Sequence, residues 1–340
     1  MPQGGIVSSI RSFSRFGVNR RAFGELLAGA ALLALSGAAA VASDLKEVAI
    51  DFATYNPVSL VLKKQGLLEK ALEQDGIKVR WVQSAGSNKA LEFLNAGSID
   101  FGSTAGSAAL VARINGNPIK SIYVYSRPEW TALVAGKDSP ISKVADLKGK
   151  RVAVTRGTDP HIFLVRALAE AGLTDKDVKF VLLQHADGRL ALSRGDVDAW
   201  AGLDPMMAAA EVEEGAKLFY RKPEANTWGI LNVREDFAKE HPEVVKKVLA
   251  AYEEARKWAL ANPDGLKEEF IAVTKLPKVV VDRQIDQRTE LTHSVIGAPQ
   301  RQSIQAAGDA LVAAGVLPAG AKVKETLDVL IDPQYLPAGR

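Results

Sequence analysis

Short runs of small residues, several of them carrying hydroxyl groups, follow the apolar strands expected along this chain. The run Ser103-Thr104-Ala105-Gly106 comes after the apolar stretch Ile99–Phe101 and directly before a helical stretch. Small side chains let a ligand approach the backbone closely. The first turn of a helix has N–H groups without intrahelical acceptors, and these donors and the helix dipole favour an anion. A capped helix after a strand explains a single run equally well, so the argument depends on repetition.

The arrangement recurs along the chain. Strands are expected at residues 48–53, 77–82 and 151–155, each followed by a short loop of small or polar residues and then by a helix. The strand expected at residues 197–201 ends in Gly202–Pro205 before another helix. Alternating strands and helices predict a mostly parallel sheet, in which ligands bind beyond the carboxyl ends of the strands. The loops are therefore expected to meet at one edge.

The remaining elements are predicted from periodicity and turn residues. Residues 58–71 are expected to form an amphipathic helix in which Gly66 marks a kink or an early end. Asp159 can cap the helix that begins near His161. Beyond the strand at 228–233 the chain reads as mostly helical, and the tail at 323–335 is expected to pack against the first domain.

Composition and charge limit the classes of function. The chain has 340 residues and no cysteine, which excludes disulfides, thiolate nucleophiles and cysteine-bound zinc. It carries 43 basic and 40 acidic residues, of which residues 1–42 contribute four arginines and one glutamate. The rest therefore has 43 − 4 = 39 basic and 40 − 1 = 39 acidic residues. A neutral chain argues against a nucleic-acid partner, which would favour a basic surface.

The first 42 residues have the features of a secretory signal. Arg20-Arg21 precedes an uncharged apolar run from Leu26 to Ala42, and Ala40-Val41-Ala42 matches a small-residue cleavage site. The paired arginines followed by Phe23 indicate the twin-arginine route. An uncleaved membrane anchor is the alternative, but the run is short and alanine-rich for a span. We expect export to the periplasm and cleavage near Ala42.

Catalytic and metal-binding signatures are weak. His161, His185, His241 and His293 are far apart and lack the spacing of metal ligands. Neither GxSxG nor HExxH is present. An ester hydrolase would need a nucleophile with a positioned base, for which Asp204 with His161 or His185 is the only candidate. The sequence therefore predicts a protein that is not an enzyme and that needs no cofactor and no metal.

Several long sequence segments resemble those of a known family. LEFLNAGSIDFGSTAGSAAL, KDSPISKVADLKGKRVAVTRGT, HIFLVRALAEAGL, RGDVDAWAGLDPMMAAAE and FAKEHPEVV are similar to the substrate-binding proteins of ABC importers for aliphatic sulfonates, taurine and nitrate. The resemblance implies an α/β, two-lobed periplasmic binding protein fold of type II with the ligand in the cleft between the lobes. One lobe would comprise residues 44–127 and 229–340, and the other residues 128–228, with crossover strands near Ser126–Trp130 and Thr227–Gly229.

The resemblance also implies which residues contact the ligand. They are Thr54, Tyr55, Asn56, Ser84, Ala85, Gly86, Ser87, Ser103, Thr104, Ala105, Gly106, Gly157, Thr158, Asp159 and Asp204. Trp130 and Trp228, with Leu203 and Met206, are expected to meet an organic group, and His161 either lines the cleft or is structural. Asp159 stands where the family often has an uncharged residue. It is expected to cap its helix, pair with Arg156, or accept a hydrogen bond from a ligand hydroxyl or amine.

The implied function is capture of a small organic anion, a sulfonate or sulfate ester, and its delivery to a membrane permease for use as a sulfur source. Neutral hydroxyls and N–H groups would hold the oxyanion. Taurine, nitrate or a nitrogen heterocycle are the alternative ligands, a periplasmic ester hydrolase is the alternative of another class, and a monomer is expected.

Overall fold

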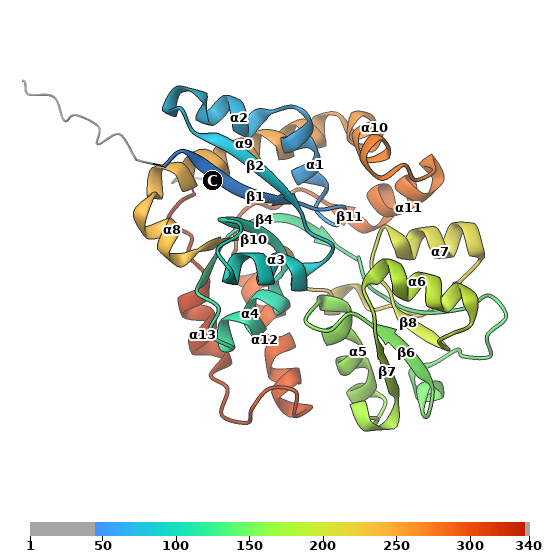
Figure 1. The fold of residues 1–340 in the computed structure, drawn as a ribbon. Coiled ribbons are helices and arrows are strands. Elements are labelled where there is room, and N and C mark those ends of the chain that lie inside the picture. Colours follow the sequence, from blue (N-terminus) through green and yellow to red (C-terminus); the bar gives the residue numbers. More distant parts are fainter. Residues whose placement is uncertain (1–44, 337–340) are drawn as a thin grey trace, which may run out of the picture. The chain divides into compact units, whose positions relative to one another are not determined.

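The computed structural model describes residues 45–336, so the expected signal peptide at residues 1–42 lies outside the described residues. Within this range the chain forms two β-sheets, each covered by helices on both faces (Figure 1). No helix in it combines the length and the apolarity needed to cross a bilayer.

The first sheet has the strand order β11-β4-β10-β3-β1-β2. Its strands are β1 (Glu47–Phe52), β2 (Lys78–Gln83), β3 (Phe101–Ala105), β4 (Ile119–Pro128), β10 (Gly229–Arg234) and β11 (Thr289–Glu290). Strand β1 runs parallel to β2 and β3, whereas β10 runs antiparallel to both β3 and β4.

The second sheet has the strand order β7-β6-β8-β5-β9. Its strands are β5 (Leu133–Ala135), β6 (Arg151–Val154), β7 (Lys179–Leu182), β8 (Ala199–Ala201) and β9 (Lys217–Tyr220). Strand β6 is parallel to β7 and β8, and β5 is antiparallel to β8 and β9.

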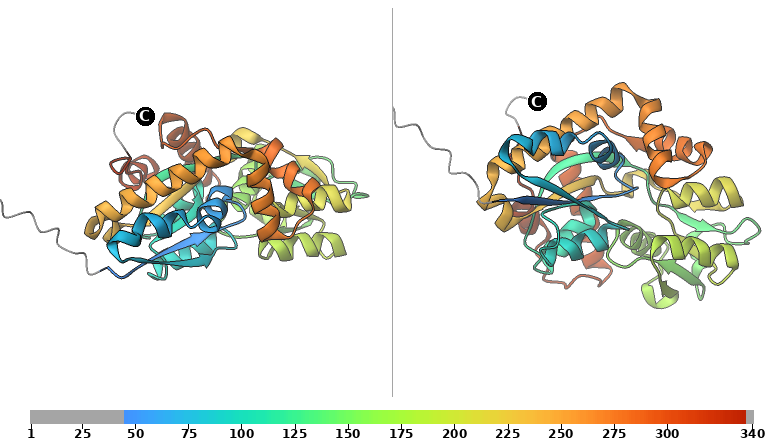
Figure 2. Two further views of the ribbon diagram at one scale, coloured as in Figure 1. Left: turned by 90° about the horizontal axis from the view of Figure 1, so that it is seen from above. Right: turned by 45° about the horizontal axis from the view of Figure 1, so that its top comes forward.

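The helices divide between the two sheets. They are α1 (Pro57–Lys64), α2 (Leu67–Leu72), α3 (Ser87–Asn95), α4 (Gly106–Ile114), α5 (Asp159–Glu170), α6 (His185–Arg194), α7 (Met206–Glu214), α8 (Glu235–Glu240), α9 (Pro242–Ala261), α10 (Pro263–Thr274), α11 (Lys278–Arg288), α12 (Ala298–Ala313) and α13 (Val323–Leu330). Helix α9 lies beside α1 and α2 (Figure 2), and α3 and α4 lie on the opposite face of the first sheet. Helix α5 covers one face of the second sheet, and α6 and α7 cover the other.

The prediction of mostly parallel strands holds only for parts of the two sheets. The chain leaves the first sheet after β4 and returns to it through β10, so these two strands run antiparallel to each other beside the parallel set. The return strand also corrects one boundary. The apolar stretch Ile99–Phe101 was expected to end before Ser103, but β3 continues to Ala105 because β10 pairs with it along its whole length.

Two helix starts also differ from the expectations. Helix α6 begins at His185, directly after the loop that ends β7, whereas the residue pattern alone predicts a start at Gly188. Helix α5 begins at Asp159, so Thr158 and not Asp159 is its N-cap residue. The expected interruption at Gly66 is confirmed, because this glycine has φ 62° and separates α1 from α2. The expected packing of the tail is confirmed by contacts of α13 with α4 and β4.

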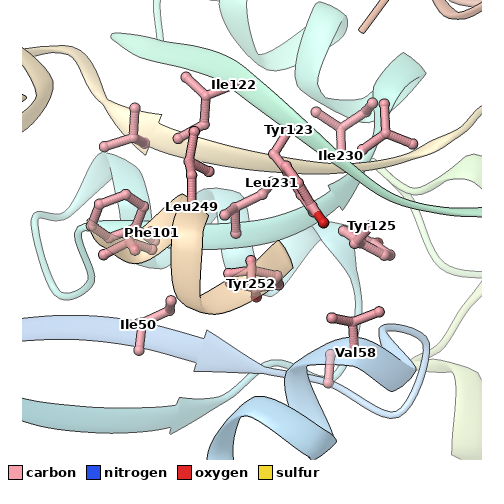
Figure 3. Packing of buried hydrophobic residues seen from close by; sticks show 14 of the residues in the cluster. Ile50, Val58, Phe101, Ile122, Tyr123, Tyr125, Ile230, Leu231, Leu249 and Tyr252 are labelled. Atoms are coloured by element: carbon pink, nitrogen blue, oxygen red, sulfur yellow. The ribbon is translucent and has the colours of Figure 1, made fainter. Parts of the chain in front are cut away.

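The main core lies between the first sheet and its helices. Figure 3 shows Leu249 and Tyr252 of α9 facing Tyr123 and Leu231 of the sheet. The rings of Tyr123 and Tyr252 lie 5.6 Å apart. Tyr125 follows on the same strand and donates a hydrogen bond to the Thr104 carbonyl, 3.2 Å away. The core thus holds β3 and its following helix in place.

Gly229 begins the strand that returns to the first sheet, and it has no room for a side chain. A Cβ at this position would lie 2.3 Å from Cε2 of Tyr125 and 2.7 Å from Oγ of Ser126. Overpacking of this kind costs about 1–3 kcal/mol. We expect Gly229→Ala to lower the free energy of unfolding in urea by that amount. Gly136→Ala, where a Cβ meets no atom within 4 Å, is the matched control and is expected to be nearly neutral.

Candidate functional site

A small cavity lies where the carboxyl ends of parallel strands from both sheets meet. Its volume is about 10 Å³, which is room for about one water molecule. Its lining residues are Tyr55, Ser87, Trp130, Thr158, Asp159, Pro160, His185 and Leu203. All of these are buried, and none carries a positive charge at neutral pH.

Three helices start at this cavity. Ser87, Asp159 and His185 are the first residues of α3, α5 and α6, and each lines the cavity. The first N–H groups of a helix lack intrahelical acceptors and carry a partial positive charge. The geometry therefore favours an acceptor with several oxygen atoms. At α5 the negative charge of Asp159 already offsets this potential, which leaves α3 and α6 as the stronger donors.

The carboxylate of Asp159 is held by four neutral donors. Its Oδ1 accepts from the hydroxyls of Ser107 (2.5 Å) and Thr227 (2.7 Å). Its Oδ2 accepts from Nε1 of Trp130 (2.8 Å) and from the backbone N–H of Thr227 (3.0 Å). Burial raises the pKa of Asp159, and these hydrogen bonds oppose the rise. The donors come from α4 of the first sheet and from the two segments that connect the sheets, so this carboxylate ties both parts together.

This arrangement differs from two of the expected roles of Asp159, the helix cap and the pair with Arg156. The side chain is not the cap of α5, and the groups that satisfy it belong to Ser107, Trp130 and Thr227 rather than to Arg156. The local sequence could not identify these partners, because Ser107 and Thr227 lie 52 and 68 residues away.

A second polar network lies beneath the cavity on the side of the first sheet. Oδ1 of Asp51 accepts from the N–H and the hydroxyl of Ser103, at 2.9 and 2.8 Å. Asn56 donates to Oγ of Ser103 (2.8 Å), and the Tyr55 hydroxyl donates to the Ser103 carbonyl (3.0 Å). These bonds place the Tyr55 ring, which meets Trp130 edge to face at 6.1 Å. Ser103 and Asn56 therefore position the cavity wall without lining it.

The stretch Thr104–Gly106, expected to hold an anion, is committed to internal contacts. The Thr104 hydroxyl donates to the Ala105 carbonyl (3.0 Å) and accepts from Nδ2 of Asn232 (2.8 Å). The N–H of Ala105 donates to Oγ of Ser87, and that of Gly106 to the Trp228 carbonyl. A Cβ on Gly106 would lie 2.5 Å from Ile304, so this glycine serves helix packing. The Thr104 hydroxyl thus has no hydrogen left for a ligand.

Several other expected site residues are also placed elsewhere. Asp204 accepts from Arg288 (3.1 Å) and from the N–H of Ala208 (2.9 Å), with both charged side chains nearly inaccessible. Trp228 packs on His293 at 4.8 Å between ring centroids. His161 lies in a separate hollow with Arg156 and Leu317. Burial, with a smaller effect of Arg156, lowers the pKa of His161 to about 4.

The remaining loop residues are not among those that line the cavity, and Gly157 lines the separate hollow with His161. The Thr54 carbonyl accepts from Gln284 (3.4 Å), and the N–H of Ser84 donates to the Phe52 carbonyl (3.0 Å). Ala85 precedes Gly86, where a Cβ would lie 3.0 Å from Nε2 of His185. Gly157 has φ 79°, and its ideal Cβ position is 3.7 Å from Cβ of Asn88. The loop between β2 and α3 therefore touches residues of the second sheet's loops.

Three residues that matter here were missed by the sequence analysis. His185 was treated as structural, although it follows a strand of the second sheet and this position alone could have indicated the cavity edge. Thr227 was seen only as part of a connection. Arg288 gave no local signal, because its partners Asp204 and Glu211 lie far away in the sequence.

Comparison with known proteins supports the same fold. A family model described as NMT1/THI5 like matches residues 72–266. The structure of the alkanesulfonate-binding protein SsuA from Xanthomonas axonopodis pv. citri, bound to MOPS, is similar with a TM-score of 0.76 and 27% identity over 84% of this chain and 98% of that one. The periplasmic aliphatic sulphonate binding protein SsuA from Escherichia coli has a TM-score of 0.71 and 28% identity, covering 87% and 95%.

Two further relatives widen the range of functions. A taurine-binding periplasmic protein of Escherichia coli (strain K12) is 28% identical over 69% of this chain and 74% of its own length. A 4-amino-5-hydroxymethyl-2-methylpyrimidine phosphate synthase of Aspergillus parasiticus is 25% identical over 64% and 68%. The more similar proteins are thus binding proteins with the periplasmic binding protein fold, and a more distant relative is an enzyme.

The four bonds to Asp159 predict the effect of Asp159→Asn. An amide has one acceptor oxygen, and neither Nε1 of Trp130 nor the N–H of Thr227 can become an acceptor. The amide N–H groups of the variant must therefore point at the hydroxyls of Ser107 and Thr227, and the hydrogens of these hydroxyls must turn away. We expect the free energy of unfolding to fall by about 1–3 kcal/mol, measured by urea denaturation. Asp138→Asn on an exposed loop is the control. Equal stability of both variants would contradict the role assigned to Asp159.

The raised pKa of Asp51 predicts that the free energy of unfolding depends on pH. Burial raises the pKa of Asp51 from 3.8 to about 6, against hydrogen bonds from Ser103 that lower it. Between these values the folded protein holds a proton that the unfolded chain has released, so stability falls as the pH rises through this window. The loss from this group approaches about 3 kcal/mol at pH 7. We expect the difference in unfolding free energy between the native protein and Asp51→Asn to change by this amount between pH 3.5 and pH 7.

Proposed function

Because this chain belongs to the NMT1/THI5-like family, we propose that it is the periplasmic solute-binding component of an ABC importer that captures an organic sulfonate or sulfate ester. The relatives named for aliphatic sulfonates support this ligand class, and they match most of the chain. The ligand site we assign is the cavity at the starts of α3 and α6.

The observation that carries the proposal is the convergence of these helix starts on one cavity lined by neutral groups. Ser87 and His185 approach from different sheets, and Gly86 leaves space between them. A sulfonate stays ionised at all physiological pH values and only accepts hydrogen bonds. It therefore suits backbone N–H donors, which never need to lose a proton. Tyr55, Trp130 and Leu203 offer an apolar surface for the organic group.

Ligand entry requires a movement of the two sheets. A cavity of about 10 Å³ is too small for a sulfonate, so the loops of the two sheets must separate. We place the hinges in the segments after β4 and before β10, at Ser126–Trp130 and Thr227–Gly229, which divides the chain into lobes at 44–127 with 229–340 and at 128–228. Hinge closure of this kind is common in periplasmic binding proteins.

Other assignments have less support from the contacts. Taurine, with its sulfonate group, would use the same donors. Nitrate would leave much of the apolar wall without a partner, and a neutral nitrogen heterocycle would bring no anionic oxygen to the helix starts. A hydrolase would need Asp204 beside a histidine, but Asp204 is paired with Arg288 and is not among the cavity-lining residues of the described chain. We therefore infer a binding protein that is not an enzyme.

Export and partners follow from the same proposal. The leader at residues 1–42, with Arg20-Arg21 and the site near Ala42, would direct the chain through the twin-arginine route. The mature protein would act as a monomer that docks on a membrane permease. A small organic anion is its cargo, and the neutral charge balance gives no reason to expect a nucleic acid.

We expect butanesulfonate to raise the melting temperature. A ligand that binds only the folded state stabilises it by about 2.7 kcal/mol at a hundred times its dissociation constant. For a chain of this size this is a shift of several degrees, at roughly 2–4 °C per kcal/mol. Pentanoate, with a planar carboxylate, and spermidine, a cation, are the matched ligand controls and are expected to give much smaller shifts.

Two glycine variants test where butanesulfonate binds. Gly86→Ala would place a methyl group 2.8 Å from Oδ1 of Asn88 and 3.0 Å from Nε2 of His185, so it should reduce the shift with butanesulfonate. Gly136→Ala, in open space, should leave it unchanged. Stabilisation by spermidine but by none of a panel of sulfonates and sulfate esters would overturn the proposed ligand class.

A further inference from the structure

One ring nitrogen at the cavity has no partner. His185 is 1% exposed and lines the cavity as the first residue of α6. Its Nε2 makes no hydrogen bond with any residue of the range 45–336. The nitrogen faces the loop of the first sheet, because an ideal Cβ on Gly86 would lie only 3.0 Å from it. A buried polar atom aimed into a cavity is expected to meet a ligand or a water molecule.

The hydrogen bonds on the other side of the ring determine which nitrogen carries the proton. Nδ1 lies 3.2 Å from Oγ1 of Thr155, and that hydroxyl lies 2.7 Å from the Leu183 carbonyl, to which it donates. A hydroxyl has a single hydrogen. Oγ1 can therefore only accept from Nδ1, which places the proton of the neutral ring on Nδ1. Nε2 then presents a bare lone pair to the cavity.

A bare lone pair does not suit a sulfonate. Sulfonate oxygens are acceptors only, so they would face another acceptor at Nε2. A proton on Nε2 turns this nitrogen into a donor and adds a positive charge next to the starts of α3 and α6. The alternative neutral form, with the proton moved from Nδ1 to Nε2, requires the Thr155 hydroxyl to turn away from Leu183. It would leave a carbonyl without its donor.

The titratable groups near His185 come from its own helix and from three neighbouring segments. Asp159 of α5 and Tyr55, which precedes α1, line the cavity with it. On its own helix Asp187 lies in the first turn, and Arg189 pairs with Glu213 and Glu214 of α7. Burial lowers the pKa of His185 to about 3, so the ring of the free protein is neutral at neutral pH.

From this geometry we propose that His185 takes up a proton at Nε2 when a sulfonate binds, so that the protein couples capture of the anion to capture of one proton. The inference rests on the proposed function. The proton comes from solvent and is held at Nε2 between the ring and a sulfonate oxygen, while Nδ1 keeps its bond to Thr155.

The size of the coupling follows from Coulomb's law. An anion about 4 Å from the ring, at an effective dielectric constant near 20, favours the protonated ring by roughly a thousandfold. At pH 5 most of the complex would then carry a charged His185, whereas at pH 8 almost none would. We expect butanesulfonate to bind roughly tenfold more tightly at pH 5 than at pH 8, by linkage of the two equilibria.

Titration calorimetry with butanesulfonate at pH 5 tests the proposal. Two buffers with different protonation enthalpies, acetate and N-methylpiperazine, report the number of protons exchanged, and neither contains a sulfonate that would compete. Uptake close to one proton is expected for the native protein. His185→Gln, whose amide can donate without a charge, should bind with an uptake near zero.

His161→Gln is the matched control, because His161 is also buried with a lowered pKa but lies in the separate hollow. This variant should keep the native proton uptake. Should His185→Gln fail to fold, the imidazole ¹⁵N shifts of the native protein at pH 5, with and without butanesulfonate, report the same protonation.

The possible results separate the two proposals. Binding of butanesulfonate without proton uptake, or uptake that persists in His185→Gln, overturns the role of His185 and leaves the proposed function intact. Failure of every sulfonate and sulfate ester to bind between pH 5 and pH 8 overturns the proposed function and this inference with it.

Discussion

The buried carboxylate of Asp159 determines how the two halves of this protein meet. A buried charge is costly unless hydrogen bonds replace the water that it loses. Here the replacement comes from Ser107, Trp130 and Thr227, which belong to a helix of the first sheet and to the two connecting segments. Hydrogen bonds to charged groups are worth about 1.5–3 kcal/mol each. The arrangement of the sheets described here is therefore the one in which Asp159 is satisfied.

A second contact joins the same two parts. Arg288 at the end of α11 pairs with Asp204, which precedes α7, and with Glu211 of α7. Apolar contacts accompany both the hydrogen bonds of Asp159 and the ion pairs of Arg288. They join α5 to α12 and α7 to α11. Charged side chains that could have met a ligand are thus used to hold the sheets together. What remains at the cavity are backbone N–H groups, aromatic rings and one histidine.

This division of roles explains how a site without a cation can suit an anion. The starts of α3 and α6 supply partial positive charge that needs no counter-ion and that does not titrate. The only group in the described cavity wall that can gain a positive charge is His185, and burial keeps it neutral in the free protein at neutral pH. The carboxylate of Asp159 accepts hydrogen bonds from its own four donors. It therefore does not compete with a ligand for the N–H groups at the starts of α3 and α6.

The sequence alone determined the repeated units, the loops after the strands and the family, because periodicity and small-residue loops are local properties. Of the ligand contacts that the family resemblance implied, Tyr55, Ser87, Trp130, Thr158 and Asp159 line the cavity. Partners that lie far apart in the chain were decided only by the tertiary structure. The donors of the Thr104 stretch are used by the Ala105 carbonyl, by Oγ of Ser87 and by the Trp228 carbonyl. Asp204 is paired with Arg288, which lies 84 residues away in the sequence. Ser107 and Thr227 donate hydrogen bonds to Asp159 for the same reason. Folding brings these donors close to it, and no local sequence pattern encodes that proximity.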